Sequence, residues 1–516
     1  MINAIFMTPG LIKPISLLFF LISFGIVIAQ SPKKVEFDAD YIEMNERISK
    51  DAKRLIGNVV FRHDGSTMYC DSAYYYSELN SLDAYSNVFV NQGDTLFMYS
   101  NKLYYNGNTK FSKAYGNVRL IDDSTTLYTE KLDFDMHSNI GFYENNGKII
   151  NNADTLYSIK GYYYNRKDLF HFMDSVVVVN KDYIGYSDTM DYMPGLNTII
   201  FKGPTEVFGR SEDKEYMYCE SGWYNTEIDE ARISKNALFK GKQKGMIADS
   251  ISYDKKRTFT EGFGNLSLTD TANKITIKGN YGWYYEKPEK SMVTDSALLI
   301  YKSDSSWFYL HADTLRTHTN DSDSTKKFIA YHSVKFYRND LQGQCDSLSY
   351  AESDSIIRMY ETPIIWSETH QITATYIEIF TGKERIDSAL LYKTPFIVTE
   401  QDSVTFNQMR GKFMTCYFTN NDLSSVLIVG NGETVYFPMN DDSTITSVNK
   451  AIGERIKLLL NDREIKKIYF FSEPNATYYP LEQAPSEELV LKGFQWLDAL
   501  RPKTMMDIFN TQPSKD

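Results

Sequence analysis

The sequence predicts an all-β fold of elongated shape, a repeat β-jellyroll or β-solenoid, and three observations lead to this fold class. A short phrase returns about every 29 to 30 residues, which is the signature of a repeat architecture. Apolar and polar side chains alternate within the copies, as they do in strands that bury one face. Aromatic residues make up 15% of the 516 residues and only 14 residues are proline, a composition that favours strands over disorder.

The first phrase is a small or turn-forming pair followed by Val-x-apolar. Clear copies are Gly57 to Phe61 (Gly-Asn-Val-Val-Phe) and Gly116 to Leu120 (Gly-Asn-Val-Arg-Leu), and weaker copies continue to about residue 366. Steps of 29 and 30 residues separate Asn58, Asn87 and Asn117. Because alternate side chains of a strand share a face, the valine and the closing apolar residue should point into a common interior. The predicted interior row is Val59, Phe61, Val88, Val118, Leu120, Val176, Val178, Leu266, Leu268, Val334 and Phe336.

A second phrase alternates with the first: a small residue, usually an acidic residue, then an alternating run that ends in Tyr or Phe. Cys70 to Tyr75 (Cys-Asp-Ser-Ala-Tyr-Tyr), Ser100 to Tyr105 and Ser187 to Tyr192 are examples. Each period therefore holds at least two strands. Such a unit cannot bury its own apolar face, whereas a stack of about twelve units can, and strands about 4.8 Å apart would make that stack on the order of 100 Å long.

The chain divides into three predicted regions. Residues 1–29 have the pattern of a secretory signal peptide, because Lys13 precedes an apolar run from Ile15 to Ile28 that is too short to span a bilayer and ends in a small-residue cleavage site. Residues 30–400 are predicted to be the tandem β repeats. Residues 401–516, where the rhythm fades, are predicted to form a small α+β cap. The leader predicts export.

Two elements are expected within the cap. Arg455 to Leu460 and Ile465 to Phe471 flank a polar turn and predict a β-hairpin. Ser486 to Leu500 carries leucines and aromatic residues at helical spacing and predicts a short helix.

The cysteines are predicted to be free, buried thiols. Cys70, Cys219 and Cys345 occupy the same slot of the second phrase, where other copies carry Ser, Thr or Ala. Copies several periods apart would lie tens of ångströms from one another, whereas a disulfide needs Cα atoms within about 7 Å. Cys416 lies beyond the repeats and has no obvious partner.

These alternating phrases, Gly-Asn-Val-x-apolar and Ala-Asp-x-apolar-x-Tyr, follow a signal peptide, and the chain thereby resembles the OstA/LptA family of periplasmic lipopolysaccharide transport proteins. The resemblance covers roughly residues 35 to 400 and rests on the repetition of short, degenerate motifs. It implies a twisted, open-sided stack whose apolar interior carries acyl chains of lipopolysaccharide between the two membranes. The interior row would then be core and lipid path together, in a protein of the periplasm that bridges toward the outer membrane.

The resemblance also implies partners. An open stack exposes unpaired edge strands at both ends. In the family these edges are implied to pair with similar folds in the inner-membrane and outer-membrane transport components, or end to end with further copies. The first edge strand is expected at Val35 to Ile42. The resemblance implies no catalytic residue, metal or cofactor.

Two other readings of the residues stay open. The interior row is equally compatible with a closed, dry solenoid that is structural or adhesive. A solenoid of this kind that binds or degrades polysaccharide would need two acidic residues to converge within about 5 to 10 Å. The acidic slot favours a solvated column instead, and the seven histidines show no metal-ligand spacing. The acidic slot contains Asp71, Glu130, Asp188, Glu220, Asp249, Asp313 and Asp346.

The formal net charge of −12 makes nucleic acid an unsuitable partner, because phosphate binding needs a basic patch. The same charge opposes binding of an anionic lipid, so a local group of Lys and Arg or divalent cations would be required. The sequence does not locate such a basic edge.

Overall fold

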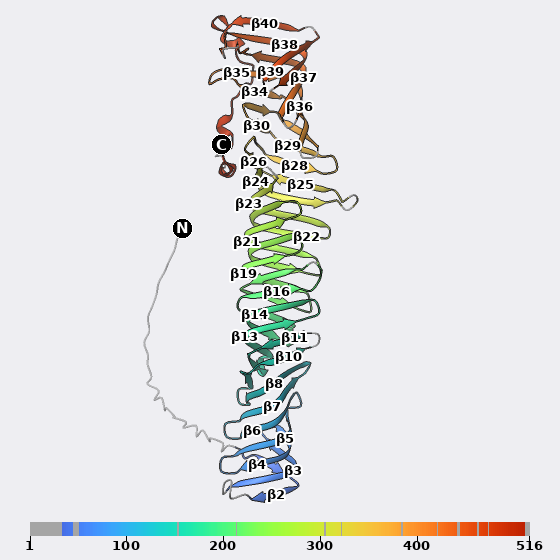
Figure 1. Cartoon of the computed structure of the whole chain (residues 1–516), viewed down its shortest axis with the longest axis vertical. Helices are drawn as coiled ribbons and strands as arrows, with labels where there is room; N and C mark the ends of the chain where they lie inside the picture. Colours follow the sequence, from blue (N-terminus) through green and yellow to red (C-terminus); the bar gives the residue numbers. More distant parts are fainter. Residues whose placement is uncertain are drawn as a thin grey trace, which may run out of the picture.

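The protein is a long rod built from one antiparallel sheet (Figure 1). This computed structural model describes residues 33–44, 51–151, 154–212, 214–303, 306–320, 322, 324–382, 385–419, 422–440, 444–461, 464–472 and 474–510. Its 40 strands all belong to that sheet, with the N-terminal strands at one end of the rod and the C-terminal strands at the other. The predicted all-β class and elongated shape are confirmed. The predicted signal peptide lies outside the described residues.

The first rungs of the rod follow the predicted two-strand period. Six long strands form consecutive antiparallel pairs, so one strand carries the first phrase and the next carries the second. Below them, β1 (Glu36–Asp38) and β2 (Tyr41–Met44) pair with the two halves of β3. The six strands are β3 (Ala52–His63), β4 (Ser66–Tyr76), β5 (Ser81–Gln92), β6 (Leu96–Asn106), β7 (Phe111–Asp122) and β8 (Thr125–Asp135).

The middle rungs mix long strands with pairs of short ones. They are β9 (Ile140–Tyr143), β10 (Gly147–Asn151), β11 (Asp154–Ser158), β12 (Lys160–Tyr164), β13 (Leu169–Val179), β14 (Tyr183–Met193), β15 (Thr198–Phe201), β16 (Thr205–Gly209), β17 (Tyr216–Cys219), β18 (Ser221–Asn225), β19 (Glu230–Lys240), β20 (Lys244–Asp254), β21 (Phe259–Asp270), β22 (Ile275–Glu286), β23 (Glu289–Lys302) and β24 (Trp307–Thr319).

The upper rungs consist mostly of short strands, and the sheet continues without a break past residue 400. They are β25 (Lys326–Tyr331), β26 (Val334–Arg338), β27 (Leu341–Cys345), β28 (Ser347–Ala351), β29 (Ile356–Tyr360), β30 (Ile364–Ser367), β31 (His370–Thr373), β32 (Tyr376–Gly382), β33 (Arg385–Tyr392), β34 (Phe396–Glu400), β35 (Phe406–Arg410), β36 (Phe413–Thr419), β37 (Asp422–Tyr436), β38 (Ser447–Asn461), β39 (Glu464–Phe471) and β40 (Asn475–Pro480). The division of the chain at residue 400 stays a prediction.

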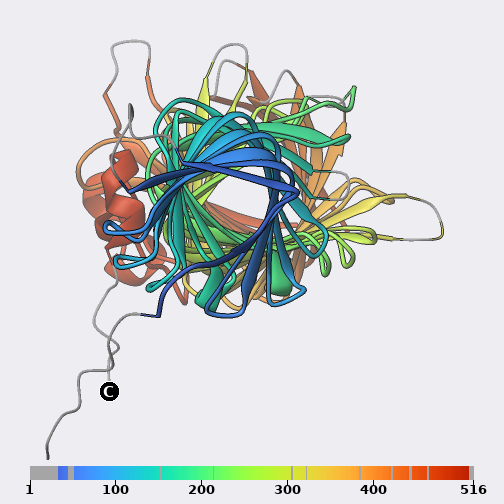
Figure 2. The same cartoon turned by 90° about the horizontal axis from the view of Figure 1, so that it is seen from below.

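Each first phrase forms a corner. Gly116 and Asn117 have φ angles of +73° and +48°, and the pairing of β7 with β8 shifts register between Tyr115 and Val118. A bulge of this kind bends a strand sharply, so the two halves of β7 lie in different walls of the rod. Positive φ angles favour Gly and Asn, which explains the composition of the phrase. Figure 2 shows the result along the rod, with strands surrounding a common axis.

Proline divides the strand at some corners. Pro204 separates β15 from β16, Pro363 separates β29 from β30, and Pro395 separates β33 from β34. Proline has no N–H to donate to a ladder, so the two halves of the bent strand become separate strands. The corners therefore keep their place in the repeat whether or not the strand is continuous.

The predicted C-terminal hairpin is confirmed, and the predicted helix is wrong. β38 and β39 pair antiparallel, with Arg455 opposite Phe471. Residues 486–500 form two 3-10 turns, η4 (Ser486–Glu488) and η5 (Asp498–Leu500), joined by an irregular segment. Two backbone N–H groups of this segment bond to side chains of the sheet: those of Leu491 and Leu497 donate to side-chain amide oxygens at 2.8 and 2.7 Å. The other 3-10 turns are η1 (Asn165–Lys167), η2 (Pro194–Leu196), η3 (Leu481–Gln483) and η6 (Met505–Phe509).

We call residues 481–510 the strap. The strap leaves the last strand, β40, and runs back outside the wall of the upper rungs, where its coils lie beside the ring of strands in Figure 2. Its end reaches the middle of the rod, since Lys335 donates a hydrogen bond to the Asn510 carbonyl and the His311 and Phe509 rings lie 4.8 Å apart. The strap therefore spans the upper rungs from the end of the rod downward.

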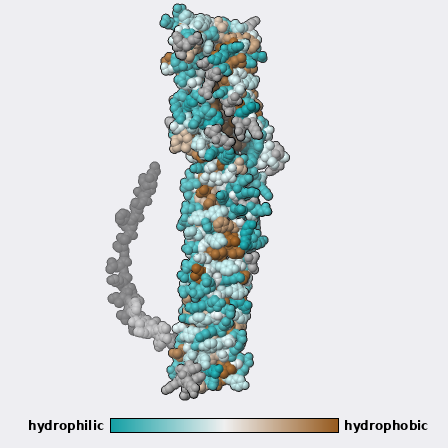
Figure 3. Space-filling model, in the orientation of Figure 1, coloured by the Kyte–Doolittle hydropathy of each residue, from teal (hydrophilic) through white to brown (hydrophobic). Residues whose placement is uncertain are grey.

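Two apolar cores result from this arrangement. One continuous cluster runs inside the rod from Val35 to Leu460. A smaller cluster lies between the outer wall and the strap and contains Phe396, Val435 and Leu491. Elsewhere the outer face seen in Figure 3 is largely hydrophilic, with scattered apolar patches.

The four cysteines are buried and free, as predicted. Burial raises the pKa of Cys70 to about 11 and that of Cys416 to about 12, so both thiols stay protonated at neutral pH.

Candidate functional site

The predicted interior row lies inside the rod. Ten of its members belong to the continuous core, among them Val59 and Val334 with no exposed surface, and Leu268 packs against that core half-buried. Side chains from successive rungs meet there and form an unbroken apolar column. Its use as a lipid path stays a prediction, because the column is filled by side chains along most of its length.

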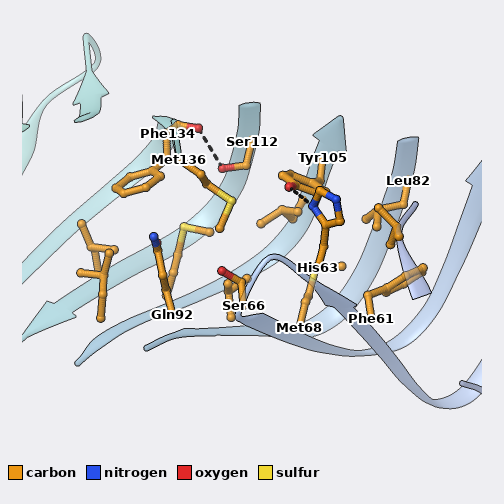
Figure 4. Close-up of a pocket in the computed structure, with 16 residues that line it drawn as sticks. Phe61, His63, Ser66, Met68, Leu82, Gln92, Tyr105, Ser112, Phe134 and Met136 are labelled. Atoms are coloured by element: carbon orange, nitrogen blue, oxygen red, sulfur yellow. Dashed lines mark hydrogen bonds between the residues drawn. The ribbon is translucent and has the colours of Figure 1, made fainter. Parts of the chain in front are cut away.

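The lower rungs contain a small apolar cavity of about 50 Å³ (Figure 4). Phe61 and Leu120 of the predicted row line it, together with Tyr105 and Phe134, which end second phrases. Three methionines, Met68, Met98 and Met136, form part of the wall. The full lining is Val35, Phe61, His63, Ser66, Met68, Leu82, Val90, Gln92, Leu96, Met98, Leu103, Tyr105, Ser112, Leu120, Phe134 and Met136.

The cavity lies beside a seam along the rod, where two rows of hairpin turns face each other. One row follows the first-phrase strands and includes residues 64–65 and 93–95, and the other follows the second-phrase strands and includes residues 107–110 and 136–139. Polar side chains join the rows: Lys110 donates a hydrogen bond to Asp64, and the Gln92 amide donates to Asn139 Oδ1 at 3.0 Å. These bonds close the side of the rod.

Tyrosine hydroxyls supply a second set of seam contacts. The hydroxyl of Tyr105 lies 2.8 Å from His63 Nδ1, across 42 residues of sequence. Equivalent contacts join Tyr163 to Asp122 across 41 residues, Asn151 to Tyr192 across 41 and Lys244 to Tyr284 across 40. Each tyrosine ends a second phrase. His63, Asp122 and Asn151 end a first-phrase strand, whereas Lys244 begins the strand that follows one. The common spacing makes these contacts a repeated feature of the fold.

We call this series of contacts the tyrosine ladder and each contact a step. At the step between Tyr105 and Tyr163, a phenylalanine stands in place of the tyrosine, so the hydroxyl is missing. Phe134 ends the second phrase on β8 and therefore occupies the position that Tyr105 holds on β6. Its expected partner, 42 residues earlier, is Gln92, which bonds to Asn139 instead. Both Phe134 and Gln92 line the cavity. The cavity thus coincides with the step at which a phenylalanine replaces the tyrosine.

Comparison with known proteins bears on this region. Residues 33–188 match the family model described as OstA-like protein. These residues are an OstA-like domain. No curated protein matches the chain. Among solved structures, the WD40 domain of SCAP from fission yeast is 8% identical, in an alignment that covers 83% of this chain and 98% of that one, with a TM-score of 0.11, and this likeness supports no argument.

The OstA-like domain contains the whole cavity and the two seam contacts on either side of it, His63–Tyr105 and Asp122–Tyr163. Burial raises the pKa of Tyr105 to about 12, so its hydroxyl keeps its proton at neutral pH. Sequence reasoning missed the seam entirely. The phenylalanine at position 134, between Tyr105 and Tyr163 at the two neighbouring positions, was the available signal.

The rim of the cavity carries a small basic group. The carboxylate of Asp64 is shared by Lys110 and by Lys33, whose Nζ lies 3.5 Å from Asp64 Oδ1. The hydrogen bond from Lys110 holds the pKa of Asp64 below its usual range. Two ammonium groups therefore face one carboxylate on the lower side of the cavity. On the upper side, burial raises the pKa of Asp122, and Asp168 and Asp123 add repulsion.

The acidic slot of the second phrase braces the corners of the rod. Asp71 accepts a hydrogen bond from Asn87 at 2.8 Å, and Glu220 accepts one from Asn236 at 2.7 Å. Both asparagines belong to the first phrase that follows. Within the described residues no group of three or more His, Cys, Asp and Glu side chains is arranged to hold a metal ion, and no helix there is long and apolar enough to cross a membrane.

Both ends of the rod present strand edges. Within the described part of the chain, β1 and β2 pair with β3 alone, and β39 and β40 pair with β38 alone. Apolar side chains are exposed there, including Tyr41 (73%) at the lower end and Tyr478 (63%) at the upper end. Unpaired edges of this kind can accept a further strand.

Proposed function

We propose that the protein binds the acyl chains of lipopolysaccharide in its apolar interior and shields them from water as a bridge across the periplasm. The OstA-like domain supports a role in lipopolysaccharide transport. In this proposal the chain has no catalytic activity and needs no cofactor. The predicted leader would export the protein to the periplasm.

The continuous apolar core is the observation that carries this proposal. It extends from the first rung to the last, so a hydrocarbon chain could pass from one rung to the next without meeting a polar layer. Burial of hydrocarbon contributes roughly 0.8 kcal/mol per methylene group, which makes such a column a favourable environment for an acyl chain. The side chains that now fill the column would have to move aside for the lipid.

The exposed edges supply the sites for partners. Components of similar fold in the inner and outer membranes would add strands to β1 and β2 at one end and to β39 and β40 at the other. Association of two copies end to end would use the same edges. Main-chain hydrogen bonds would join the two sheets, and the exposed tyrosines at both ends would gain packing partners.

A second candidate function is polysaccharide binding by a closed, structural rod. Aromatic rings stack on the outer wall of the lower rungs: the centroid of Phe89 lies 5.9 Å from that of Tyr69 and 4.8 Å from that of Tyr99. A column of this kind could pack against sugar rings. We rank it second because many of its ring faces already stack on one another.

Mass spectrometry of co-purifying lipid tests the first function. We would express the full chain in a lipopolysaccharide-producing host, recover the protein from the periplasm and look for stoichiometric species containing lipid A. Val118→Asp, which places a carboxylate in the interior, should abolish the lipid. Arg119→Asp is the matched control, because Arg119 stacks on Tyr99 at the outer wall. Folded, lipid-free wild-type protein would refute the proposal.

A further inference from the structure

We propose that the cavity between the His63–Tyr105 and Asp122–Tyr163 contacts is a lateral portal, through which one hydrocarbon chain of an amphiphile enters or leaves the interior. This inference rests on the proposed function and names the place where the lipid crosses the wall. The polar head would stay outside the seam while the chain occupies the cavity. The end strands would then be free to bind partners.

The seam contacts on either side of the portal define its limits. Below it, Tyr105 meets His63, and the Asn80 side chain holds the backbone of residues 33–35: its Oδ1 accepts from Val35 N at 3.0 Å and its Nδ2 donates to the Lys33 carbonyl at 3.2 Å. Above it, Tyr163 bonds to Asp122. Between these contacts, Gln92 makes one hydrogen bond across the seam to another described residue, and its partner is Asn139. The step beside the cavity therefore lacks the hydroxyl contact that closes the wall at the steps directly below and above it.

Phe134 explains why the wall is weak at this step. A tyrosine here could form the hydroxyl contact seen at the neighbouring steps, whereas the phenylalanine ring can only pack. Figure 4 shows Phe134 and Met136 on one side of the cavity and His63 and Tyr105 farther along it. Apolar side chains at the seam can separate without leaving a buried polar group unsatisfied, and this lowers the cost of opening.

The wall of the cavity suits a flexible hydrocarbon chain. Met68, Met98 and Met136 are unbranched and can change shape, as the methionines of adaptable binding surfaces do. Polar atoms are few in the lining and lie toward the seam, on His63, Ser66, Gln92, Tyr105 and Ser112. This gradient, apolar inside and polar at the wall, matches an amphiphile whose chain points inward.

The rim offers a place for an anionic head group. Lys33 and Lys110 share one carboxylate, so the lower rim carries an excess of positive charge in a chain with a net charge of −12. The side chain of Lys33 is 76% exposed and free to turn toward a bound phosphate or carboxylate. Attraction at this rim would orient the amphiphile with its chain toward the cavity.

Stopped-flow uptake of a pyrene-labelled long-chain fatty acid by delipidated full-chain protein tests the portal. Phe134→Tyr should restore the seam hydroxyl and slow uptake roughly three- to ten-fold, the effect expected of one added hydrogen bond on an opening equilibrium. The amount bound at equilibrium should change little, because the interior is untouched. Phe89→Tyr, the same change on the outer wall, is the control and should leave the rate unchanged.

The outcomes separate the portal from the function. If the wild-type protein takes up the probe and Phe134→Tyr does so at the same rate, the portal is overturned and the lipid-binding function stands. If the folded wild-type protein takes up neither this probe nor purified lipid A, both proposals fail. Slower uptake by Phe134→Tyr together with unchanged uptake by Phe89→Tyr supports the portal, and thermal melting of each variant confirms that it is folded.

Discussion

The lower rungs and the upper rungs repeat the same corner but differ in what covers their walls. Around the cavity, the outer face of the OstA-like domain is exposed to solvent. In the upper rungs the strap lies on the outer face, so β34 buries four of its five residues. Two of these, Phe396 and Val398, belong to the smaller core beneath the strap. A wall buried on both faces should be held more firmly than one buried on a single face, so we expect the lower rungs to open more readily than the upper rungs.

A column of glutamines fixes the strap to the upper wall. Gln408 donates to the Leu489 carbonyl at 3.0 Å and accepts from Leu491 N at 2.8 Å, so its amide takes the place of a neighbouring strand. Gln371 does the same with Gln495 and Leu497, at 2.8 and 2.7 Å. Below them Gln342 accepts a bond from Arg501 at 2.7 Å. These amides turn the outer face of the wall into a docking site for the chain's own C-terminal segment.

The largest expected effect is the release of the strap. Gln371→Leu combined with Gln408→Leu removes the four hydrogen bonds that these side chains make to the strap. Strap backbone groups then lose their partners, at a cost of about 1–3 kcal/mol for each buried group left unsatisfied. We expect limited proteolysis to cut within residues 489–497 while the lower rungs stay intact. The control is Gln92→Leu, which loses one seam bond and should leave the strap protected. An unchanged cleavage pattern in the double variant would show that apolar packing alone holds the strap.

A smaller effect should distinguish the packing of the two regions' interiors. Val90 and Val178 occupy the same position of the first phrase, but only Val90 lines the cavity. Val178→Phe should overpack the core and destabilise the protein by about 1–3 kcal/mol, whereas Val90→Phe should fill empty space at little cost. Chemical denaturation of both variants measures the difference. Equal destabilisation would mean that the cavity cannot accept a larger group.

A change at a single corner should cost less. Gly264 has a φ of +71°, and a Cβ atom there would lie 2.2 Å from Asp249 Oδ2. Gly93 has a φ of +63° in a hairpin turn with no atom within 4 Å of such a Cβ. Each Gly→Ala change should destabilise the protein by about 1 kcal/mol through its backbone conformation, and Gly264→Ala should cost more because Asp249 must move. Similar melting temperatures for the two variants would contradict a bracing role for the corner.

The local features of the fold could be predicted from the sequence, because they depend on contacts within one period. The two-strand unit, the inward valines such as Val118 and the free thiols follow from alternation and slot composition. The hairpin at Arg455 to Phe471 has its own turn. None of these predictions needed information about how distant parts of the chain meet.

The strap and the seam could not be predicted, because their partners are remote. The backbone of Leu491 bonds to a side chain 83 residues away, and that of Leu497 to one 126 residues away. Helical spacing of apolar residues in residues 486–500 therefore indicated the wrong structure. The seam contacts span 40 to 42 residues, which is not a multiple of the period, so alignment of the repeats alone does not reveal them.

The smallest effect concerns the reactivity of two thiols. Cys70 lies on β4 of the lower rungs with 5% of its surface exposed, and Cys416 lies on β36 with none. If the lower rungs open more often, a thiol reagent should label Cys70 first and Cys416 last, and mass spectrometry of peptides after timed labelling gives the order. Burial raises the pKa of Cys70 from its ordinary 9.0 to about 11, so the closed state holds the unreactive thiol. The closed fold favours the protonated thiol of Cys70, and this contribution to stability is fully present below pH 9 and is lost as the pH rises toward 11. Labelling of Cys70 should therefore accelerate in that range. Labelling of Cys416 before Cys70 would reverse the comparison and place the mobile end of the rod beneath the strap.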